Sequence, residues 1–224
     1  MTWALLPVKG LDEAKSRLAP LLTPAERRQL TLAMLDDVLA ALARCSSLEC
    51  CVVIGSDADV RLLAQRHGAE FLAEPTRNGG LNDALTAGLH RATERGATGA
   101  LIVPADVPLI DASAIKALID RAPQRGLAIC PARDGQGTNG LILRPPNCCA
   151  PRFGPGSFTA HANAARDGGL DVVVVDCAAL GLDIDSPDDL AELAQRGAQG
   201  ATRKVLATLD LGERLARGVD SGQR

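Results

Sequence analysis

The chain has 224 residues, of which 46% are hydrophobic, 23% charged and 2% aromatic. This length and hydrophobic content exclude an intrinsically disordered chain and predict a sizeable buried core. With 24 basic and 27 acidic residues the formal net charge is −3, which argues against a general grip on nucleic acid. No apolar run reaches the length of a membrane span, and the N-terminal MTWALLPVKG lacks the basic region of a signal peptide. We therefore expect a cytoplasmic protein that binds neither nucleic acid nor membrane.

Apolar runs alternate with helical patterns along the chain. The predicted strands cover residues 3–8, 51–54, 70–73, 101–103, 127–130, 140–143 and 172–175. The predicted helices begin at Pro24, cover 57–67, 81–95 and 112–121, run from Ser157 through 165, begin after Ser186, and cover 204–216. Thr23-Pro24-Ala25-Glu26 has the pattern of a capping box, Asp111 and Ser186 are predicted helix caps, and Asn78-Gly79-Gly80 is a predicted turn.

This alternation predicts an α/β fold, a three-layer α/β/α sandwich with a mostly parallel sheet. Residues 127–176 break the alternation, and there we expect an antiparallel excursion over one end of the sheet. No repeat or linker divides the chain, so we expect a single domain over residues 1–200 and a C-terminal helical tail over 201–224. Seven cysteines without CxxC spacing predict free, mostly buried thiols, and neither a zinc site nor a disulfide framework.

Two acidic clusters follow predicted strands. Asp106, in LIVPADVPL, falls just past a strand, at the edge where open α/β sheets bind ligands. Asp183 and Asp185, in LDID, follow the run VVVV, and residues two apart on a strand share a face. Carboxylates from two strand ends would together hold a divalent cation, which suits phosphate chemistry. The alternative is that these residues only cap turns, since the helix cap Ser186 follows at once.

The loop after the first strand, residues 7–18, carries Lys9, Lys15 and Arg17. Three cations in one loop could wrap a triphosphate, with backbone N–H groups as further donors. The loop matches neither the Walker pattern nor GxGxxG, and the alternative is an ordinary solvated loop.

Two glycine-rich segments, GQGTN (135–139) and FGPGS (153–157), suggest a second anion site. Ser157 lies near a helix N-terminus, where the free N–H groups of its neighbours would bind a phosphate or carboxylate, and Thr138 would add a hydroxyl. The alternative is a pair of tight turns. His161, four residues after Ser157 on the same helix face, is either a core histidine or one that orients a neighbouring group.

Taken in order, LPVKGLDEAKSRLAP, the helix with Glu26 and Arg27, PADVPL, GTNGLIL, FGPGS and LDIDSPDDL resemble a known family over roughly residues 1–195. These are the guanylyltransferases of coenzyme F-420 biosynthesis, which belong to the nucleotidyltransferases of the molybdopterin-guanylyltransferase type. The resemblance implies transfer of GMP from GTP to the phosphate of 2-phospho-L-lactate, phosphoenolpyruvate or 3-phospho-D-glycerate, with release of pyrophosphate. It also implies a partner, a deazaflavin transferase that accepts the product.

The same resemblance implies roles for individual residues, carried over by position. Magnesium would be held by Asp106, Asp185 and Asp183. Catalysis would depend on Asp106, Lys15 and Arg17, the two cations holding the GTP phosphates. The nucleotide would contact Pro7, Val8, Lys9, Lys15, Arg17 and Asn82. The phospho-acid would contact Thr138, Gly154 and Ser157. The glycine-rich GGxxxR segment of the wider superfamily is missing here.

Two rival functions share parts of this pattern. A cytidylyl- or sugar-1-phosphate nucleotidyltransferase would use the same sheet and metal chemistry, but would leave GTNG and FGPGS unexplained. A non-catalytic nucleotide-binding subunit would not need the carboxylates of Asp106 and Asp185.

Overall fold

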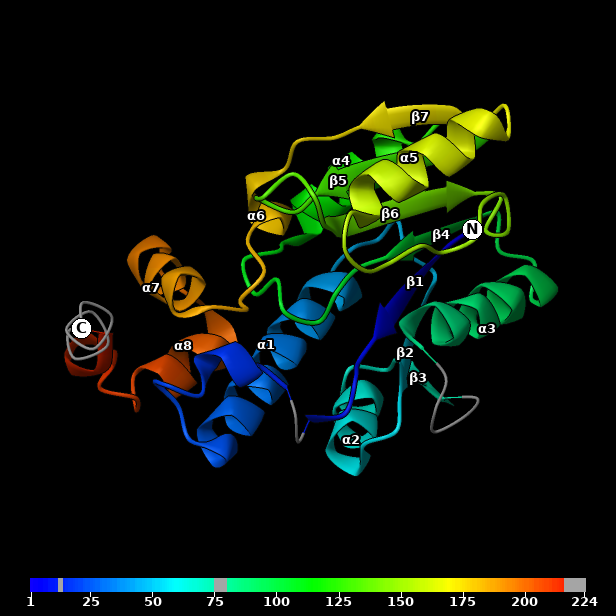
Figure 1. Ribbon diagram of the computed structural model, residues 1–224. Helices are drawn as coiled ribbons and strands as arrows, with labels where there is room; N and C mark the ends of the chain where they lie inside the picture. The colour runs from blue at the N-terminus through cyan, green and yellow to red at the C-terminus, as the bar shows by residue number, and fades with distance from the viewer. Residues whose placement is uncertain (12–13, 75–79, 216–224) are drawn as a thin grey trace.

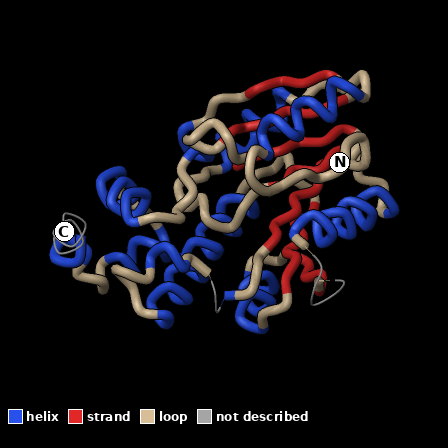
Figure 2. Tube along the Cα trace, viewed as in Figure 1, coloured by secondary structure: helices blue, strands red, loops and turns tan. Residues whose placement is uncertain are grey.

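The structure is a computed structural model that describes residues 1–11, 14–74 and 80–215. In this part of the chain a seven-stranded sheet lies between layers of helices (Figures 1 and 2). The strands are β1 (Thr2–Pro7), β2 (Cys50–Gly55), β3 (Glu70–Ala73), β4 (Gly99–Ile102), β5 (Gly126–Pro131), β6 (Thr138–Arg144) and β7 (Asp171–Val174). Their order across the sheet is β3-β2-β1-β4-β6-β5-β7.

Helices cover both faces of the sheet. They are α1 (Pro24–Ala43), α2 (Ala58–Arg66), α3 (Leu81–Glu94), α4 (Ala112–Arg121), α5 (Ser157–Asp167), α6 (Ala178–Gly181), α7 (Pro187–Arg196) and α8 (Gly200–Leu206), with a short 3-10 helix, η2 (Ser16–Leu18). Neighbouring strand residues point to opposite faces, so Leu6 joins the apolar core under α1, α2 and α4, and Leu5 joins the core under α3 and α5. The predicted α/β/α sandwich is therefore confirmed.

The segment that breaks the alternation supplies the expected antiparallel strand, β6, but this strand does not lie over one end of the sheet. Instead, β6 is inserted between β4 and β5 and runs antiparallel to both, while β5 and β7 pair in parallel. Because β6 is reversed, its first residues, Thr138 and Asn139, lie at the edge where the parallel strands end. This placement brings the GTNG segment to the side of the sheet that carries the loops after β1 and β4.

The predicted starts of α1, α4 and α7 are confirmed. Thr23 and Glu26 form the capping box of α1 with Pro24 in its first turn, and Asp111 and Ser186 cap α4 and α7. The four-residue helix α6 was not predicted. Residues 78 and 79 of the predicted turn lie outside the described residues.

A third apolar cluster, beside the sheet, packs α7 and α8 against the start of α1 and the segment around η2 (Figure 1). Here the predicted helix over 204–216 is wrong at its start. The Asp37 carboxylate of α1 accepts the N–H groups of Ala201 (2.7 Å) and Thr202 (2.8 Å), so α8 begins at Gly200. Turns at 207–210 then interrupt the helix. The division at residue 200 between a domain and a tail stays a prediction.

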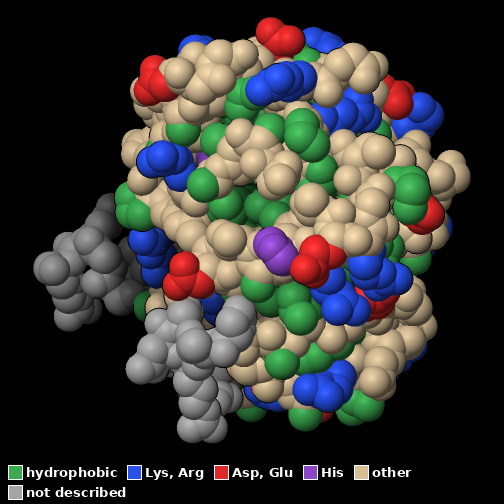
Figure 3. All heavy atoms as spheres, turned by 90° about the vertical axis from the view of Figure 1, so that its right-hand side faces the viewer, with side chains coloured by type: hydrophobic (Ala, Val, Ile, Leu, Met, Phe, Trp, Pro, Cys, Tyr) green, Lys and Arg blue, Asp and Glu red, His purple; other side chains and the backbone are tan. Residues whose placement is uncertain are grey.

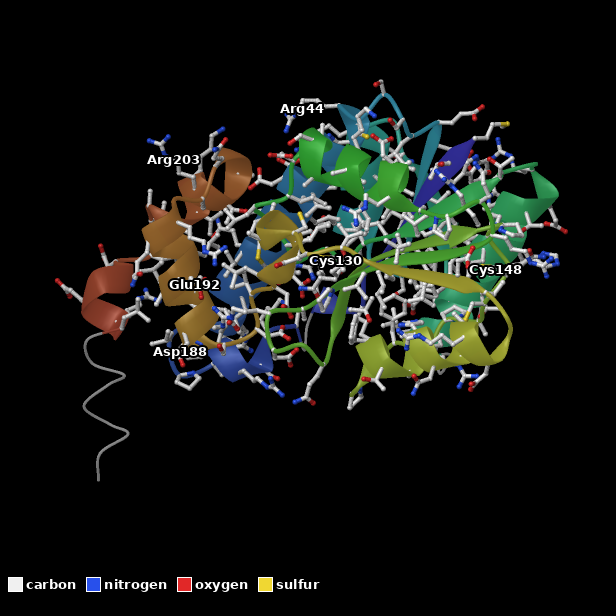
Figure 4. All side chains as sticks on the ribbon, turned by 90° about the horizontal axis from the view of Figure 1, so that it is seen from above. Arg44, Cys130, Cys148, Asp188, Glu192 and Arg203 are labelled. Atoms are coloured by element: carbon white, nitrogen blue, oxygen red, sulfur yellow. The ribbon has the colours of Figure 1, made fainter. Side chains whose placement is uncertain are left out.

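The distribution of surface charge and the state of the cysteines agree with what the composition predicts. Acidic and basic side chains are interspersed with hydrophobic ones over the face drawn in Figure 3. The seven cysteines are free, three of them buried and four half-buried, and Cys130 on β5 lies far from Cys148 (Figure 4). Within the described residues, no helix combines the length and apolar character needed to cross a membrane.

Candidate active site

Lys15 joins two acidic residues at the carboxyl edge of the sheet. Its ammonium Nζ donates to Asp106 Oδ2 and, over 2.7 Å, to Asp185 Oδ1. Lys15 follows β1, Asp106 follows β4 and Asp185 precedes α7, so three distant segments meet here. The Lys15 side chain is 7% exposed, while those of Asp106 and Asp185 are 24% and 48% exposed. The two carboxylates thus face one cation and remain accessible from solvent.

Backbone contacts hold this arrangement. Lys15 has a left-handed backbone (φ 56°, ψ 39°), which is uncommon for a residue other than glycine and costs about 1 kcal/mol or more. Arg27 on α1 steadies the loop, because its guanidinium donates to the carbonyls of Ala14 (3.3 Å) and Leu22 (3.0 Å). The N–H of Ile184 donates to the Asp106 carbonyl (3.1 Å), which ties the two acidic segments together.

The electrostatics favour a charged Lys15. Burial lowers the pKa of its ammonium, but attraction to Asp106 and Asp185 outweighs burial and leaves the pKa raised. The second oxygen of Asp106, Oδ1, is buried and has no hydrogen-bond partner among the described residues. An orphaned carboxylate oxygen in a buried site is costly unless a ligand satisfies it.

Asp183 precedes Asp185 by two residues in the chain and accepts a hydrogen bond from Asn139. The Asn139 amide Nδ2 donates to Asp183 Oδ1 (3.0 Å) and to the Leu180 carbonyl of α6 (2.9 Å). Burial raises the pKa of Asp183; the Asn139 hydrogen bond opposes this, and the nearby carboxylates add to it. Across residues 1–11, 14–74 and 80–215, no three His, Cys, Asp or Glu side chains are grouped as a metal site. The three-carboxylate magnesium site therefore stays a prediction.

Sequence reasoning missed Asn139. The signal was present, since an amide beside Thr138 at a strand start must find partners once it is buried, and Asn139 is 4% exposed. Its carbonyl partners, Leu180 and Gly181, belong to α6, which the sequence did not predict.

A buried polar network links β6 to α5. Ser157 Oγ and Thr138 Oγ1 are 3.1 Å apart, and Thr138 Oγ1 lies 3.3 Å from His161 Nδ1. The N–H of Arg152 donates to His161 Nε2 over 2.8 Å. Burial lowers the pKa of His161 to about 4, against a hydrogen bond with the Ser157 backbone that raises it. His161 is therefore neutral at pH 7 and fully satisfied inside the fold.

The FGPGS loop departs from one sequence-based expectation. The N–H groups of Ser157 and its neighbour Phe158 are not free, because they donate to the carbonyls of Gly154 (3.1 Å) and Gln136 (2.9 Å). Gly154 is exposed and has φ 136°, a conformation that favours glycine. An anion at this loop would have to use the hydroxyls more than these two N–H groups.

The residues predicted to contact the nucleotide lie in different environments. Pro7 ends β1, Val8 is buried, and Lys9 and Arg17 are exposed. Asn82, at the start of α3, forms two hydrogen bonds with the backbone of Phe153 through its side-chain amide. Its Nδ2 donates to the Phe153 carbonyl (3.0 Å), and its Oδ1 accepts the Phe153 N–H (2.8 Å). In this structure Asn82 fixes the FGPGS loop, and its contact with a base stays a prediction.

Comparisons with a family model and with curated proteins both find guanylyltransferases. Residues 2–222 match the model of a family described as "Guanylyl transferase CofC like". The chain is 44% identical to the phosphoenolpyruvate guanylyltransferase of Sphaerobacter thermophilus, over 90% of this chain and 96% of that protein. It is 38% identical to the 2-phospho-L-lactate guanylyltransferase of Methanothermobacter thermautotrophicus, over 98% and 96%.

Solved structures share the fold at low identity. A structure described as a nucleotide-diphospho-sugar transferase from Desulfovibrio desulfuricans superposes with a TM-score of 0.77 at 18% identity, covering 96% of this chain and 97% of that one. A nucleotidyl transferase from Methanothermobacter thermautotrophicus gives 0.69 at 16%, covering 88% and 97%.

The neutral state of His161 predicts a pH dependence of stability. Its pKa is about 4 in the folded chain and 6.5 ordinarily, so between these values the unfolded chain binds the extra proton. Lowering the pH from 7 to 5 should then cost about 2 kcal/mol of unfolding free energy through this residue. Urea unfolding at both pH values measures it. His161→Asn should flatten the dependence, whereas His90→Asn, at an exposed site on α3, should not. Equal pH dependence in wild type and His161→Asn would contradict the assignment.

Proposed function

This chain belongs to the CofC-like guanylyl transferases, and on that premise we propose that it joins the GMP of GTP to the phosphate of a three-carbon phospho-acid, releasing pyrophosphate. The observation that carries the proposal is the meeting of Lys15, Asp106 and Asp185 at the carboxyl edge of the sheet. In open α/β sheets this edge is the ligand-binding side. A cation between two carboxylates suits a reaction in which phosphate charges approach one another.

The residues of the site fit an anionic nucleophile. A substrate phosphate is ionised near neutral pH, so the reaction needs no general base. His161, which contacts Thr138, is neutral and buried. The difficulty is repulsion between two polyanions. Lys15, charged and fixed, and Arg17, exposed on the same loop, would bind the triphosphate and offset the charge that develops on pyrophosphate.

The carboxylates also fit a hard divalent cation. Carboxylate oxygens suit Mg²⁺, and the orphaned Oδ1 of Asp106 is an unused acceptor at the site. Asp106 and Asp185 would hold the ion, with Asp183 as the third carboxylate. When bound, the ion would supply positive charge that screens the approaching phosphates and helps to fix their geometry.

The phospho-acid would bind beside these groups. The hydroxyls of Thr138 and Ser157 and the exposed Gly154 are the proposed contacts. Relatives of this chain are named for phosphoenolpyruvate and for 2-phospho-L-lactate. The third candidate, 3-phospho-D-glycerate, differs from these in the position of its phosphate. A deazaflavin transferase of coenzyme F-420 biosynthesis would accept the product, in the cytoplasm.

Incubation with GTP, Mg²⁺ and each of the three acids tests this function. We expect pyrophosphate release and a diphospho-linked guanosine adduct by mass spectrometry with at least one acid, at a rate at least about tenfold above that with CTP or UTP. Preference for CTP or UTP would favour a rival nucleotidyltransferase. GTP binding without Mg²⁺ and without pyrophosphate release would favour a non-catalytic subunit.

Asp106→Asn tests the acidic site. The amide keeps the shape of the side chain but removes its charge, so we expect kcat to fall by about 100-fold or more while the far-ultraviolet circular dichroism stays unchanged. The matched control is Asp188→Asn, at an exposed position in the first turn of α7 (Figure 4), which should keep kcat within about twofold. Near-normal turnover of folded Asp106→Asn would refute the role of this carboxylate.

A further inference from the structure

The hydroxyl pair formed by Thr138 and Ser157 lies against a histidine with both ring nitrogens engaged. The side chains of all three residues are buried, and His161 has no exposed surface. His161 Nε2 accepts the N–H of Arg152 over 2.8 Å, and Nδ1 faces Thr138 Oγ1 at 3.3 Å. An edge-on contact with the ring of Phe153 further fixes the imidazole. This network does more than satisfy buried polar groups, because it determines to which atoms the two hydroxyl groups can donate their protons.

The position of the ring proton follows from the Arg152 contact. A nitrogen that accepts an N–H bond carries no proton, so the neutral ring must be protonated on Nδ1. Nδ1–H can donate to Thr138 but cannot accept from it. The two hydroxyls then have two protons, of which one lies between Ser157 Oγ and Thr138 Oγ1. Among the described residues no carbonyl or carboxylate takes the other.

We propose that His161 is a positioning residue that makes the hydroxyl pair an obligate hydrogen-bond donor to an anionic oxygen of the phospho-acid. This inference rests on the proposed function. Because Nδ1 carries a proton and cannot accept a hydrogen bond, the free proton of the pair must point away from the ring. Ser157 follows the exposed Gly154 and Pro155 in the chain, and the N–H groups of Ser157 and Phe158 are already bonded. The hydroxyl proton is therefore a donor that the fold leaves for a ligand.

The neutrality of His161 supports this role. Burial keeps its pKa near 4, so the ring has one fixed donor and one fixed acceptor throughout the neutral pH range. A hydrogen bond to a charged oxygen is stronger than one between neutral groups. Its loss should raise the KM for the phospho-acid about tenfold or more and leave the KM for GTP unchanged.

Two substitutions separate the ring nitrogens. His161→Asn places an amide donor where Nδ1 lies, and His161→Gln places an amide acceptor where Nε2 lies. We expect His161→Asn to keep the KM for phosphoenolpyruvate, or for whichever acid the wild type uses, within about threefold. We expect His161→Gln to raise that KM about tenfold. The control is His90→Asn, exposed on α3, which should change neither KM.

Other outcomes overturn the proposal. If His161→Gln is normal and His161→Asn is impaired, the Arg152 contact alone matters. If both variants behave as wild type, or if the KM values for both substrates rise together, His161 has no specific role at the acid site.

A nitrogen-15 correlation spectrum of histidine-labelled protein at pH 7 gives a test that needs no activity. We expect the Nδ1–H tautomer for His161, and the Nε2–H tautomer would overturn the inference. A wild type that uses none of the acids but shows the Nδ1–H tautomer would contradict the proposed function, and with it the ligand, while leaving the proton assignment intact.

Discussion

One ammonium group holds together two carboxylates that would otherwise repel each other. Lys15 reaches Asp106 and Asp185, which lie 91 and 170 positions away in the chain. Without a cation, two carboxylates at one site cannot both stay ionised without a large energetic cost. The left-handed backbone of Lys15 and the bond from Ile184 to Asp106 are arranged around this contact. Any nucleotide or metal ion that enters the site must therefore interact with a fixed set of one positive and two negative groups.

The reversed strand β6 connects this charged group to the neighbouring hydroxyls. Thr138 and Asn139 are adjacent on β6, so their side chains point to opposite faces of the sheet. Asn139 reaches α6 and Asp183, whereas Thr138 reaches Ser157 and His161 on α5. These two adjacent residues of β6 thus connect the proposed metal-binding residues to the proposed binding residues for the phospho-acid. A shift in the register of β6 would change both sides at once.

Much of this architecture was visible in the sequence, because it depends on local patterns. Alternating apolar runs and helical periodicity gave the sandwich, and caps such as Thr23 and Asp111 marked the helix starts. What was missed depends on contacts between distant residues. Periodicity does not say which strands are neighbours, so the insertion of β6 was not foreseen, and α8 begins where it does because of Asp37. For the site, the sequence indicated Asp106 and Asp185 together, but the contact of Lys15 with both required its unusual backbone conformation.

A double-mutant cycle between Lys15 and Asp106 tests the central electrostatic contact most directly. The free energy of unfolding would be measured by urea denaturation in EDTA at pH 7 for wild type, Lys15→Met, Asp106→Asn and the double variant. Because the Lys15 side chain is buried and in direct contact with Asp106, we expect a coupling energy of about 1–3 kcal/mol, with the double variant less destabilised than the sum of the single variants. Additivity within about 0.3 kcal/mol would contradict it, since Lys15 would then not be the group that holds Asp106 in place.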